Sequence, residues 1–381
     1  MNILLTLGRM PKGLDLARGF SNNDCQVFVA DPHKNHISRY SNSITECRAV
    51  TAPNISADAF IQDLLEIVTD KSIDMVVPVS EESVYASLMK DRLPNNVSFF
   101  GPAFDTACML HDKFRFNQYL HEQGFPAPAC ALLGDNAAED LITNFDAVIK
   151  PVHASAGIDI QYLNKGDNLP GTTNRPAMIQ QRMFGRLLTS LSLAKKGECL
   201  ATGIYEGSIF SGSVATAFKR VDNIQAVNDF VDRFIENLNY SGFISFDLFL
   251  NEDGIAYAIE CNPRLTSGIH LFETTDIAKA ILEEEITTSI RFRQRDSFQH
   301  FWPCLGITEM SLINGGPFRH NLRHFLHSAD VTWSNNDPLP FLMMNFCSME
   351  IFKKYFLEKM SLGEAAITDV EWRGDSQINI N

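Results

Sequence analysis

The amino-acid sequence predicts an α/β protein that begins with a doubly wound unit built on a parallel sheet. Over residues 1–102, short apolar runs typical of strands alternate with amphipathic stretches typical of helices, and parallel strands joined by crossover helices produce this alternation. Residues 125–183 resemble a second, small α/β unit, and short strands dominate residues 188–220. With 381 residues, the chain is long enough for two or three packed units of roughly 100 to 200 residues each.

The elements of the first unit follow one another closely. Strands are expected at residues 3–7, 26–30, 74–79 and 97–100, and helices at residues 14–20 and 57–68. In doubly wound sheets, ligands bind at the carboxyl ends of the strands. The residues expected at those ends are Gly8, Arg9, Asp31, Ser80, Glu81 and Glu82. Each of them could equally serve only a turn or a helix cap.

Beyond the first unit, the sequence predicts further helices and strands as far as about residue 290. A helix is expected from residue 105 to residue 123, where Gly124 stops it. The later elements are a helix at 137–144, strands at 147–150, 158–163 and 178–181, short strands at 188–220, and helices at 224–238 and 277–288. The remaining residues are rich in Phe, His and Trp, which suggests packing against the core or a second subunit.

Composition excludes several classes of function. The formal net charge of −14 disfavours nucleic acids and anionic membranes as partners, because both attract basic surfaces. The first residues lack the basic region of a signal peptide, and no apolar run is long enough to span a bilayer. The eight cysteines are scattered without a CxxC pair. We therefore expect a reduced, cytoplasmic protein without nucleic-acid or membrane partners.

Residues 242–270 carry the most chemical information. They predict a hairpin with a glycine-containing turn. A pairing in which Asp247 lies opposite Ala258 makes Glu260 a diagonal neighbour of Asp247, roughly 7 to 8 Å away, and Asn262 shares their face. Two carboxylates and an amide oxygen are hard ligands suited to Mg²⁺. The alternative is a solvated acidic face, but unpaired acids are costly in strands this apolar.

The second strand of this hairpin carries a resemblance to a known family. The run ECNPR begins at Glu260, thirteen residues after Asp247. The run and its spacing resemble the metal-binding hairpin of the ATP-grasp superfamily, and in particular its carbamoyl-phosphate-synthase-like branch. The resemblance implies that Asp247, Glu260 and Asn262 bind one or two Mg²⁺ ions, with Mn²⁺ as a substitute. It also implies that Arg264 is catalytic, because a cation there stabilises charge on the transferred phosphoryl group.

The same resemblance assigns residues to ATP. Lys113 matches the family lysine on the helix before the lid subdomain, and Lys150 in the run VIKP matches the second nucleotide-binding lysine. Residues 153–157 resemble a short, glycine-poor form of the flexible lid loop, whose residues Ser155 and Gly157 are expected near the phosphates. Many members have acidic residues in the linker after the lid. Here the linker residues expected to contact the nucleotide are Gln180, Gln181 and Met183.

The resemblance covers residues 1 to about 290 and implies a domain plan. Residues 1–102 would form a Rossmann-like pre-ATP-grasp domain, and residues 103–290 an ATP-grasp domain with its lid subdomain at about 125–183. Residues 291–381 would be a C-terminal segment of unknown role. The implied function is an ATP-dependent ligase that joins a carboxylate to an amine, such as an amino acid, through an acyl-phosphate intermediate. Related proteins suggest a homodimer.

Alternatives stay open at several points. A family member could instead phosphorylate bicarbonate or carbamate, or could bind ATP as a regulatory protein without catalysis. Thr266, Ser267 and His270 could line the acceptor site or be ordinary loop residues. The three histidines His320, His324 and His327 would share one helical face, which permits a metal site. An exposed polar face is the simpler interpretation, since no acidic or cysteine ligand is obvious nearby.

Overall fold

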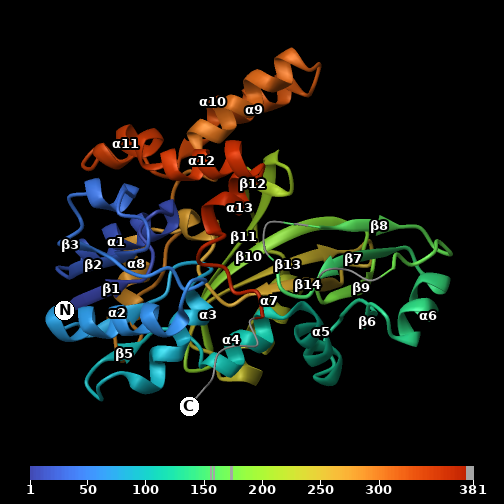
Figure 1. Ribbon diagram of the computed structural model, residues 1–381, viewed down its shortest axis with the longest axis horizontal. Helices are drawn as coiled ribbons and strands as arrows, with labels where there is room; N and C mark the ends of the chain where they lie inside the picture. Colours follow the sequence, from blue (N-terminus) through green and yellow to red (C-terminus); the bar gives the residue numbers. More distant parts are fainter. Residues whose placement is uncertain (155–156, 158, 172–174, 375–381) are drawn as a thin grey trace.

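The computed structural model describes residues 1–154, 157, 159–171 and 175–374. Its first sheet is parallel, with strand order β3-β2-β1-β4-β5, and lies at the blue end of the chain (Figure 1). The elements of this unit are β1 (Asn2–Leu5), α1 (Pro11–Ser21), β2 (Gln26–Asp31), η1 (Ile37–Tyr40), β3 (Glu46–Ala49), α2 (Ala57–Asp70), β4 (Met75–Val77), α3 (Ser83–Ala86), η2 (Ser87–Arg92) and β5 (Ser98–Phe99). The doubly wound unit predicted from the sequence is therefore confirmed.

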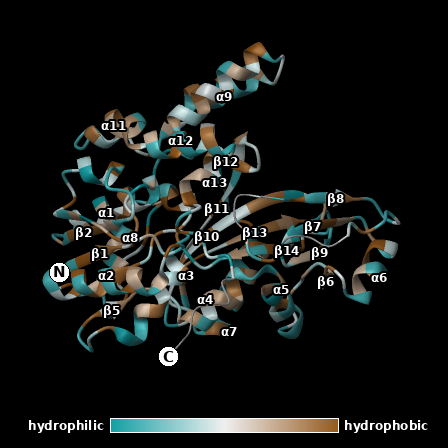
Figure 2. Cartoon of the chain, viewed as in Figure 1, coloured by the Kyte–Doolittle hydropathy of each residue, from teal (hydrophilic) through white to brown (hydrophobic). Residues whose placement is uncertain are grey.

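The centre of this sheet is buried on both faces. Ile3, Leu4 and Leu5 of β1 are at most 1% exposed, and the central strands are coloured as strongly hydrophobic in Figure 2. Strands covered on both faces form continuous apolar runs instead of alternating ones. Because β1 lies between β2 and β4, the strand order reverses beside it. In such sheets the ligand crevice lies at the carboxyl ends of the strands where the order reverses.

A second, antiparallel sheet has the order β6-β9-β7-β8 and lies at the right of Figure 1. Its elements are β6 (Cys130–Leu132), α6 (Asn136–Asn144), β7 (Ala147–Pro151), β8 (Gln161–Leu163) and β9 (Ala177–Gln181). Apolar side chains of α6 pack against this sheet. All these elements fall within residues 125–183, where the lid subdomain is expected. The exact domain boundaries stay a prediction.

The third sheet, in the order β14-β13-β10-β11-β12-β15-β16, contains the predicted hairpin. The elements up to residue 282 are α4 (Phe104–His111), α5 (Lys113–Glu122), β10 (Arg186–Lys195), β11 (Glu198–Ser211), β12 (Val214–Val221), α7 (Gln225–Leu238), β13 (Gly242–Leu250), β14 (Ala256–Asn262), η3 (Ser267–Leu271) and α8 (Thr274–Leu282). Phe116 of α5, Phe234 of α7 and Phe246 of β13 contact one another, so both helices pack against the sheet. Helix α8 packs instead on α1. Gly19 allows this contact, since a Cβ there would lie 2.3 Å from Thr274 O.

The predicted single helix at residues 105–123 is wrong, because the chain breaks at Asp112. The backbone of Asp112 is extended, with φ −73° and ψ 108°. Its side chain accepts hydrogen bonds from Phe114 N and Arg115 N, at 3.0 and 2.8 Å. An aspartate that accepts from the first turn starts a new helix. Asp112 therefore separates α4 from α5 and makes Lys113 the first residue of α5.

The C-terminal segment extends the third sheet and then forms helices. Its elements are β15 (Ser297–Gln299), α9 (Phe301–Ile313), α10 (Phe318–His327), β16 (Ala329–Asp330), α11 (Leu339–Cys347), α12 (Met349–Glu358) and α13 (Leu362–Ile367). Strand β15 pairs with β12 and so joins the third sheet, whereas α9 and α10 project from the body at the top of Figure 1. Trp333 and Phe346 remain 46% and 49% exposed. Among the described residues, no helix is long and apolar enough to cross a membrane.

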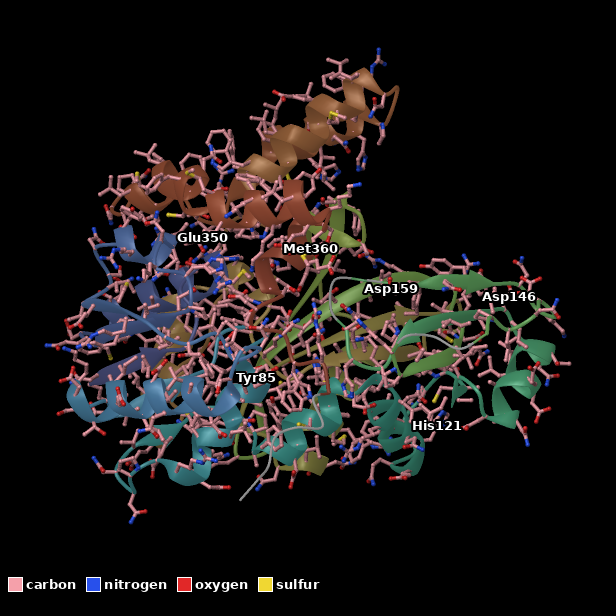
Figure 3. All side chains as sticks on the ribbon, viewed as in Figure 1. Tyr85, His121, Asp146, Asp159, Glu350 and Met360 are labelled. Carbon is pink, nitrogen blue, oxygen red and sulfur yellow. The ribbon has the colours of Figure 1, made fainter. Side chains whose placement is uncertain are left out.

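After α13 the chain returns to the first unit. Arg9 forms a buried ion cluster with Asp31, at 2.7 Å, and with Asp369, also at 2.7 Å. Three residues later, Trp372 packs between Tyr85 and Phe104. The centroid of its ring lies 4.9 Å from that of Tyr85 and 5.7 Å from that of Phe104. Tyr85 lies near the middle of the molecule in Figure 3. The last described residues are therefore held at the centre of the fold.

Candidate active site

The hairpin of β13 and β14 brings its two acids closer than the sequence predicts. Leu248 pairs with Ala258, and the next pair along β13 is Asp247 with Glu260. Ile259 between them is an extra residue, so β14 contains a bulge. The predicted diagonal arrangement is wrong for two reasons. The turn is one residue longer than assumed, because Leu250 pairs with Ala256 and not with Ile255. The bulge then shifts the register by one further residue. Asp247 and Glu260 are therefore direct cross-strand partners.

These two carboxylates lie in a partly buried, negatively charged setting. Thr189 Oγ1 on β10 donates to Asp247 Oδ1 at 2.8 Å, which orients that carboxylate. Burial and the charge of Glu260 raise the pKa of Asp247 to about 6. Among the described residues, Lys113 is the only cation within 4.0 Å of either acid, with Nζ 3.4 Å from Glu260 Oε1. Two facing acids, of which only Glu260 has a described ion-pair partner within 4.0 Å, are candidate ligands for a cation.

The two lysines predicted to bind ATP, Lys113 and Lys150, both contact residues of β14. Lys113 Nζ donates a hydrogen bond to Ala154 O, just after β7. Lys150 Nζ donates to Ile259 O at 2.9 Å, so the carbonyl of the bulge residue holds the second lysine. Both lysines are 6% exposed. Burial lowers the pKa of Lys150 to about 8, against the opposing effect of the Glu260 charge.

Asn262 and Arg264 continue the site toward the first unit. Arg264 Nη2 donates to Asn262 Oδ1 at 2.9 Å. Arg264 Nε lies 2.6 Å from Glu81 Oε2 in a buried ion pair. Burial alone would raise the pKa of Glu81, but the charges of Arg264 and Lys12 lower it. The predicted catalytic arginine therefore connects the hairpin to the carboxyl end of β4.

Lys12 is a functional candidate that sequence reasoning missed. Its Nζ donates to Leu265 O at 2.9 Å, next to Arg264. Burial and the Arg264 charge lower its pKa to about 7, although Glu81 and Glu82 act in the opposite direction. The only signal in the sequence was its place shortly after β1. By contrast, Glu82 has a structural role, since it accepts hydrogen bonds from Thr6 Oγ1 and Val79 N at 2.7 Å each.

The predicted linker residues differ in their surroundings. Gln180 is 3% exposed, and its Nε2 has no hydrogen-bond partner among the described residues. Gln181 is less buried, and its Oε1 accepts from Ala129 N at 3.3 Å. Met183 follows β9 in a half-buried loop. The unpaired amide of Gln180 therefore makes it the strongest candidate of the three for a nucleotide contact.

The lid loop is described only in part. Gly157 has φ +66°, and a Cβ there would lie 2.2 Å from Ser213 Oγ, so the loop passes close to the turn between β11 and β12. Glycine suits both that conformation and that approach. Ser155 lies outside the described residues. The expected contacts of both residues with phosphates stay a prediction.

The other candidates named from the sequence have partners of their own. His270 is fully buried and bonds Asp15 Oδ2 through Nδ1 at 2.8 Å, so it does not line an open acceptor site. Thr266 Oγ1 accepts from Tyr205 at 3.3 Å. His320 and His324 contact each other on α10, with ring centroids 4.4 Å apart and the ring planes tilted by 48°. Within the described part of the chain, no group of three His, Cys, Asp or Glu side chains is placed to hold a metal.

Comparisons with known proteins identify relatives of part of this chain. Residues 110–268 match the family described as the ATP-grasp domain. The carbamoyl phosphate synthase large chain of Thermomicrobium roseum is 21% identical over 233 residues, which are 55% of this chain but only 21% of that relative. The chain therefore spans about a fifth of its length.

Two solved structures show the same fold. One is the biotin carboxylase domain of 2-oxoglutarate carboxylase from Hydrogenobacter thermophilus, in complex with MgADP and bicarbonate. It has a TM-score of 0.58 at 14% identity, over 76% of this chain and 72% of that one. The other is the L-amino acid ligase from Bacillus licheniformis, with a TM-score of 0.53 at 16% identity, over 70% and 68% of the two chains. The two structures therefore share the fold of this chain, and the family match covers its residues 110–268.

Proposed function

We propose that this protein is an ATP-dependent ligase that joins a carboxylate to an amine through an acyl phosphate. The observation that carries the proposal is the direct pairing of Asp247 with Glu260, beside two buried lysines and the half-buried Arg264. Phosphoryl transfer needs little covalent chemistry from a protein, because positioning and charge stabilisation supply most of the rate enhancement. The residues gathered here offer both.

ATP would lie between the lid sheet and the third sheet. Lys113 from α5 and Lys150 from β7 both reach β14, and their ammonium groups would bind phosphate oxygens. Gln180, with its unpaired Nε2, would hydrogen-bond the base or ribose. The biotin carboxylase domain that has the same fold was solved with MgADP, which supports a nucleotide at this place. The specific contacts are part of the proposal.

The acidic pair fits Mg²⁺ by the chemistry of its donors. Thr189 donates to Oδ1 of Asp247 and leaves Oδ2 for another partner. Asn262 offers an amide oxygen on the same strand as Glu260. Carboxylate and amide oxygens are the ligands that Mg²⁺ prefers. Burial and the charge of Glu260 raise the pKa of Asp247, and a cation bound between the two acids would offset both effects. When bound, Mg²⁺ would neutralise charge on the nucleotide phosphates.

The acceptor substrates would lie where Arg264 meets the first unit. Arg264, Glu81 and Lys12 converge at the crevice beside β1 and β4. Arg264 would stabilise the charge on the transferred phosphoryl group and on the tetrahedral adduct that forms when the amine attacks. Lys12, with a pKa of about 7, would bind the substrate carboxylate while protonated. The lid would exclude water, which hydrolyses an acyl phosphate.

ADP release with MgATP tests the proposal. Amino acids and small organic acids are supplied singly and in pairs, with bicarbonate as a separate arm and the Glu260→Ala protein as control. Release that requires both an acid and an amine supports the ligase. Release that requires bicarbonate would assign the alternative carboxylating chemistry. ATP binding without release in any arm would replace the ligase with a regulatory role.

A homodimer completes the proposal. Apolar side chains on the C-terminal helices are exposed in the single chain, including Leu312 at 62%, Ile313 at 75% and Leu342 at 62%. Exposed apolar patches of this kind are typical of interaction surfaces. Light scattering at micromolar concentration measures the mass directly, and a strictly monomeric protein would remove this part of the proposal.

A further inference from the structure

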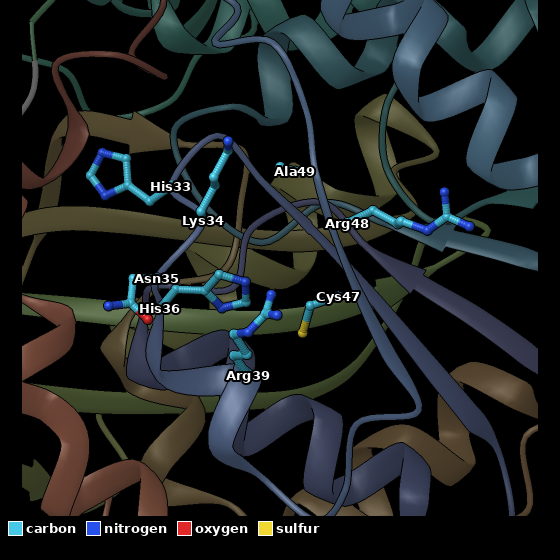
Figure 4. A pocket seen from close by; sticks show the side chains of 8 residues that line it. All are labelled: His33, Lys34, Asn35, His36, Arg39, Cys47, Arg48 and Ala49. Atoms are coloured by element: carbon cyan, nitrogen blue, oxygen red, sulfur yellow. The ribbon is translucent and has the colours of Figure 1, made fainter.

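A cavity of about 500 Å³ lies in the first unit, away from the acidic hairpin. It is formed by the loop after β2, by η1 and by the edge strand β3 (Figure 4). Its lining residues are His33, Lys34, Asn35, His36, Arg39, Cys47, Arg48 and Ala49. No aspartate or glutamate lines it, although the chain as a whole has a net charge of −14. The volume is in the range of small-molecule sites.

Some of the lining charges are already neutralised by neighbours. Arg48 Nη2 lies 2.6 Å from Asp70 on α2, and Arg48 also pairs with Glu46. His33 lies 3.6 Å from Glu350 on α12, which is labelled in Figure 3, and 3.5 Å from Asp369. These two residues therefore offer little free positive charge to a ligand.

Lys34 and Arg39 differ from Arg48 and His33 in having no acidic partner among the described residues. Both side chains are exposed, and neither forms an ion pair with any described residue. Figure 4 shows the Arg39 guanidinium between the His36 ring and the Cys47 thiol. Burial lowers the pKa of His36 and raises the pKa of Cys47 to about 12, so both are uncharged at neutral pH. The positive charge of Arg39 is therefore uncompensated on the cavity side.

The wall of the cavity is held rigidly by the end of the first strand. A Cβ at Gly8 would lie 2.4 Å from His36 Nδ1, so the ring packs directly on the glycine backbone. Ser38 Oγ donates to Gly8 O at 2.6 Å. His33 N donates to Asp31 Oδ1 at 2.7 Å. A site formed before the ligand arrives loses less entropy on binding.

We propose that this cavity binds a phosphate-bearing small molecule at a site distinct from the nucleotide site. Arg39 provides the planar donor fork that matches phosphate oxygens, and Lys34 adds a second, compact charge. Asn35 and His36 supply neutral hydrogen-bonding groups beside them, while Cys47 and Ala49 form an apolar wall for the rest of the ligand. Two free cations match the roughly −1.5 to −2 charge of a phosphate monoester at neutral pH.

Titration of inorganic pyrophosphate, followed by calorimetry without Mg²⁺, tests the site. The double variant Lys34→Ala with Arg39→Ala should weaken the binding by at least about tenfold, because two charged hydrogen-bonding groups are lost. The matched control is Lys165→Ala with Arg319→Ala, which removes two exposed cations elsewhere. That control should bind as the wild type does. Lys150→Met, which alters only the proposed nucleotide site, should retain this binding event.

Several outcomes would overturn the proposal. Equal affinity in the wild type and the Lys34/Arg39 double variant would show that the cavity is not the site. Loss of binding in Lys150→Met alone would place pyrophosphate in the nucleotide site. A wild type that binds no pyrophosphate would also refute the assignment. Citrate is titrated in a third experiment. If citrate binds as tightly as pyrophosphate, the ligand class is a polycarboxylate and not a phosphate.

Discussion

Asp247 and Glu260 are direct cross-strand partners, and Lys113 Nζ lies 3.4 Å from the second of them. We expect Glu260→Ala to reduce ADP release at least about a hundredfold, because a ligand to the proposed Mg²⁺ is lost and metal ions stabilise phosphoryl transfer by several kcal/mol. Glu252→Ala, in the exposed turn of the same hairpin, is the matched control and should retain wild-type turnover. Normal ADP release from the Glu260→Ala protein would contradict the assignment.

Asp247→Asn should separate stability from activity. The substitution keeps the shape of the side chain but removes one of two facing negative charges. Without Mg²⁺, we expect a thermal midpoint equal to or above that of the wild type, together with lost turnover, as is common where a functional site holds unfavourable charge. Differential scanning fluorimetry measures the midpoint. A clear fall in the midpoint would mean that the two acids do not repel each other in the folded protein.

Lys150→Met should weaken ATP binding. The variant keeps much of the buried stem but removes the ammonium that donates to Ile259 O. We expect the KM for ATP to rise about tenfold or more, since a hydrogen bond to a charged group contributes about 1.5 to 3 kcal/mol. Lys165→Met, an exposed position on the same lid segment, is the control. An unchanged KM in Lys150→Met would remove this lysine from the nucleotide site.

Trp372→Ala should be strongly destabilising. Its indole is 5% exposed and packs between Tyr85 and Phe104, so we expect a loss of about 3 to 5 kcal/mol in the free energy of unfolding. Trp333→Ala removes an indole that is 46% exposed and should cost less than about 0.5 kcal/mol. Urea unfolding measures both. Similar losses in the two variants would show that the end of the described chain is not held as the structure indicates.

Asp369→Asn should be destabilising in a pH-dependent way. Burial alone would raise the pKa of Asp369, but the adjacent Arg9 lowers it below its ordinary value. A lowered carboxylate pKa contributes stability above the ordinary pKa of about 3.9, and that stability is lost as the pH falls through the folded-state pKa. We therefore expect a loss of about 1 to 3 kcal/mol at pH 7 that shrinks toward pH 3. A difference between the two proteins that is constant with pH would contradict the ion pair.

The sequence predicted the parallel unit and the identity of the hairpin acids, because both depend on local pattern. It did not predict their pairing. Nothing in the run around Ile259 marks a bulge, and one extra residue changes which side chains face each other. The start of α5 could have been found, since Asp112 followed by Lys113 is compatible with a helix cap. The prediction of a single helix there relied on the spacing of apolar residues alone.

Contacts between distant segments could not be read from the sequence at all. Thr189 orients Asp247 across 58 positions, and Arg9 pairs with Asp369 across 360. No local propensity encodes which strand lies next to which. Lys12 was missed for the same reason, because its role depends on Leu265 and Arg264 lying beside it in the fold. The residue types were visible, but the neighbours that give them a function were not.

The Arg9 ion cluster also bears on how the protein is synthesised. Arg9 is translated 360 residues before Asp369. Until that aspartate emerges, the guanidinium has Asp31 as its ion-pair partner, but the bonds at 2.7 and 2.9 Å to Asp369 are missing. The first unit therefore reaches its final charge balance only after translation has passed residue 369. A nascent chain halted before residue 369 should expose this arginine to solvent and to chaperones.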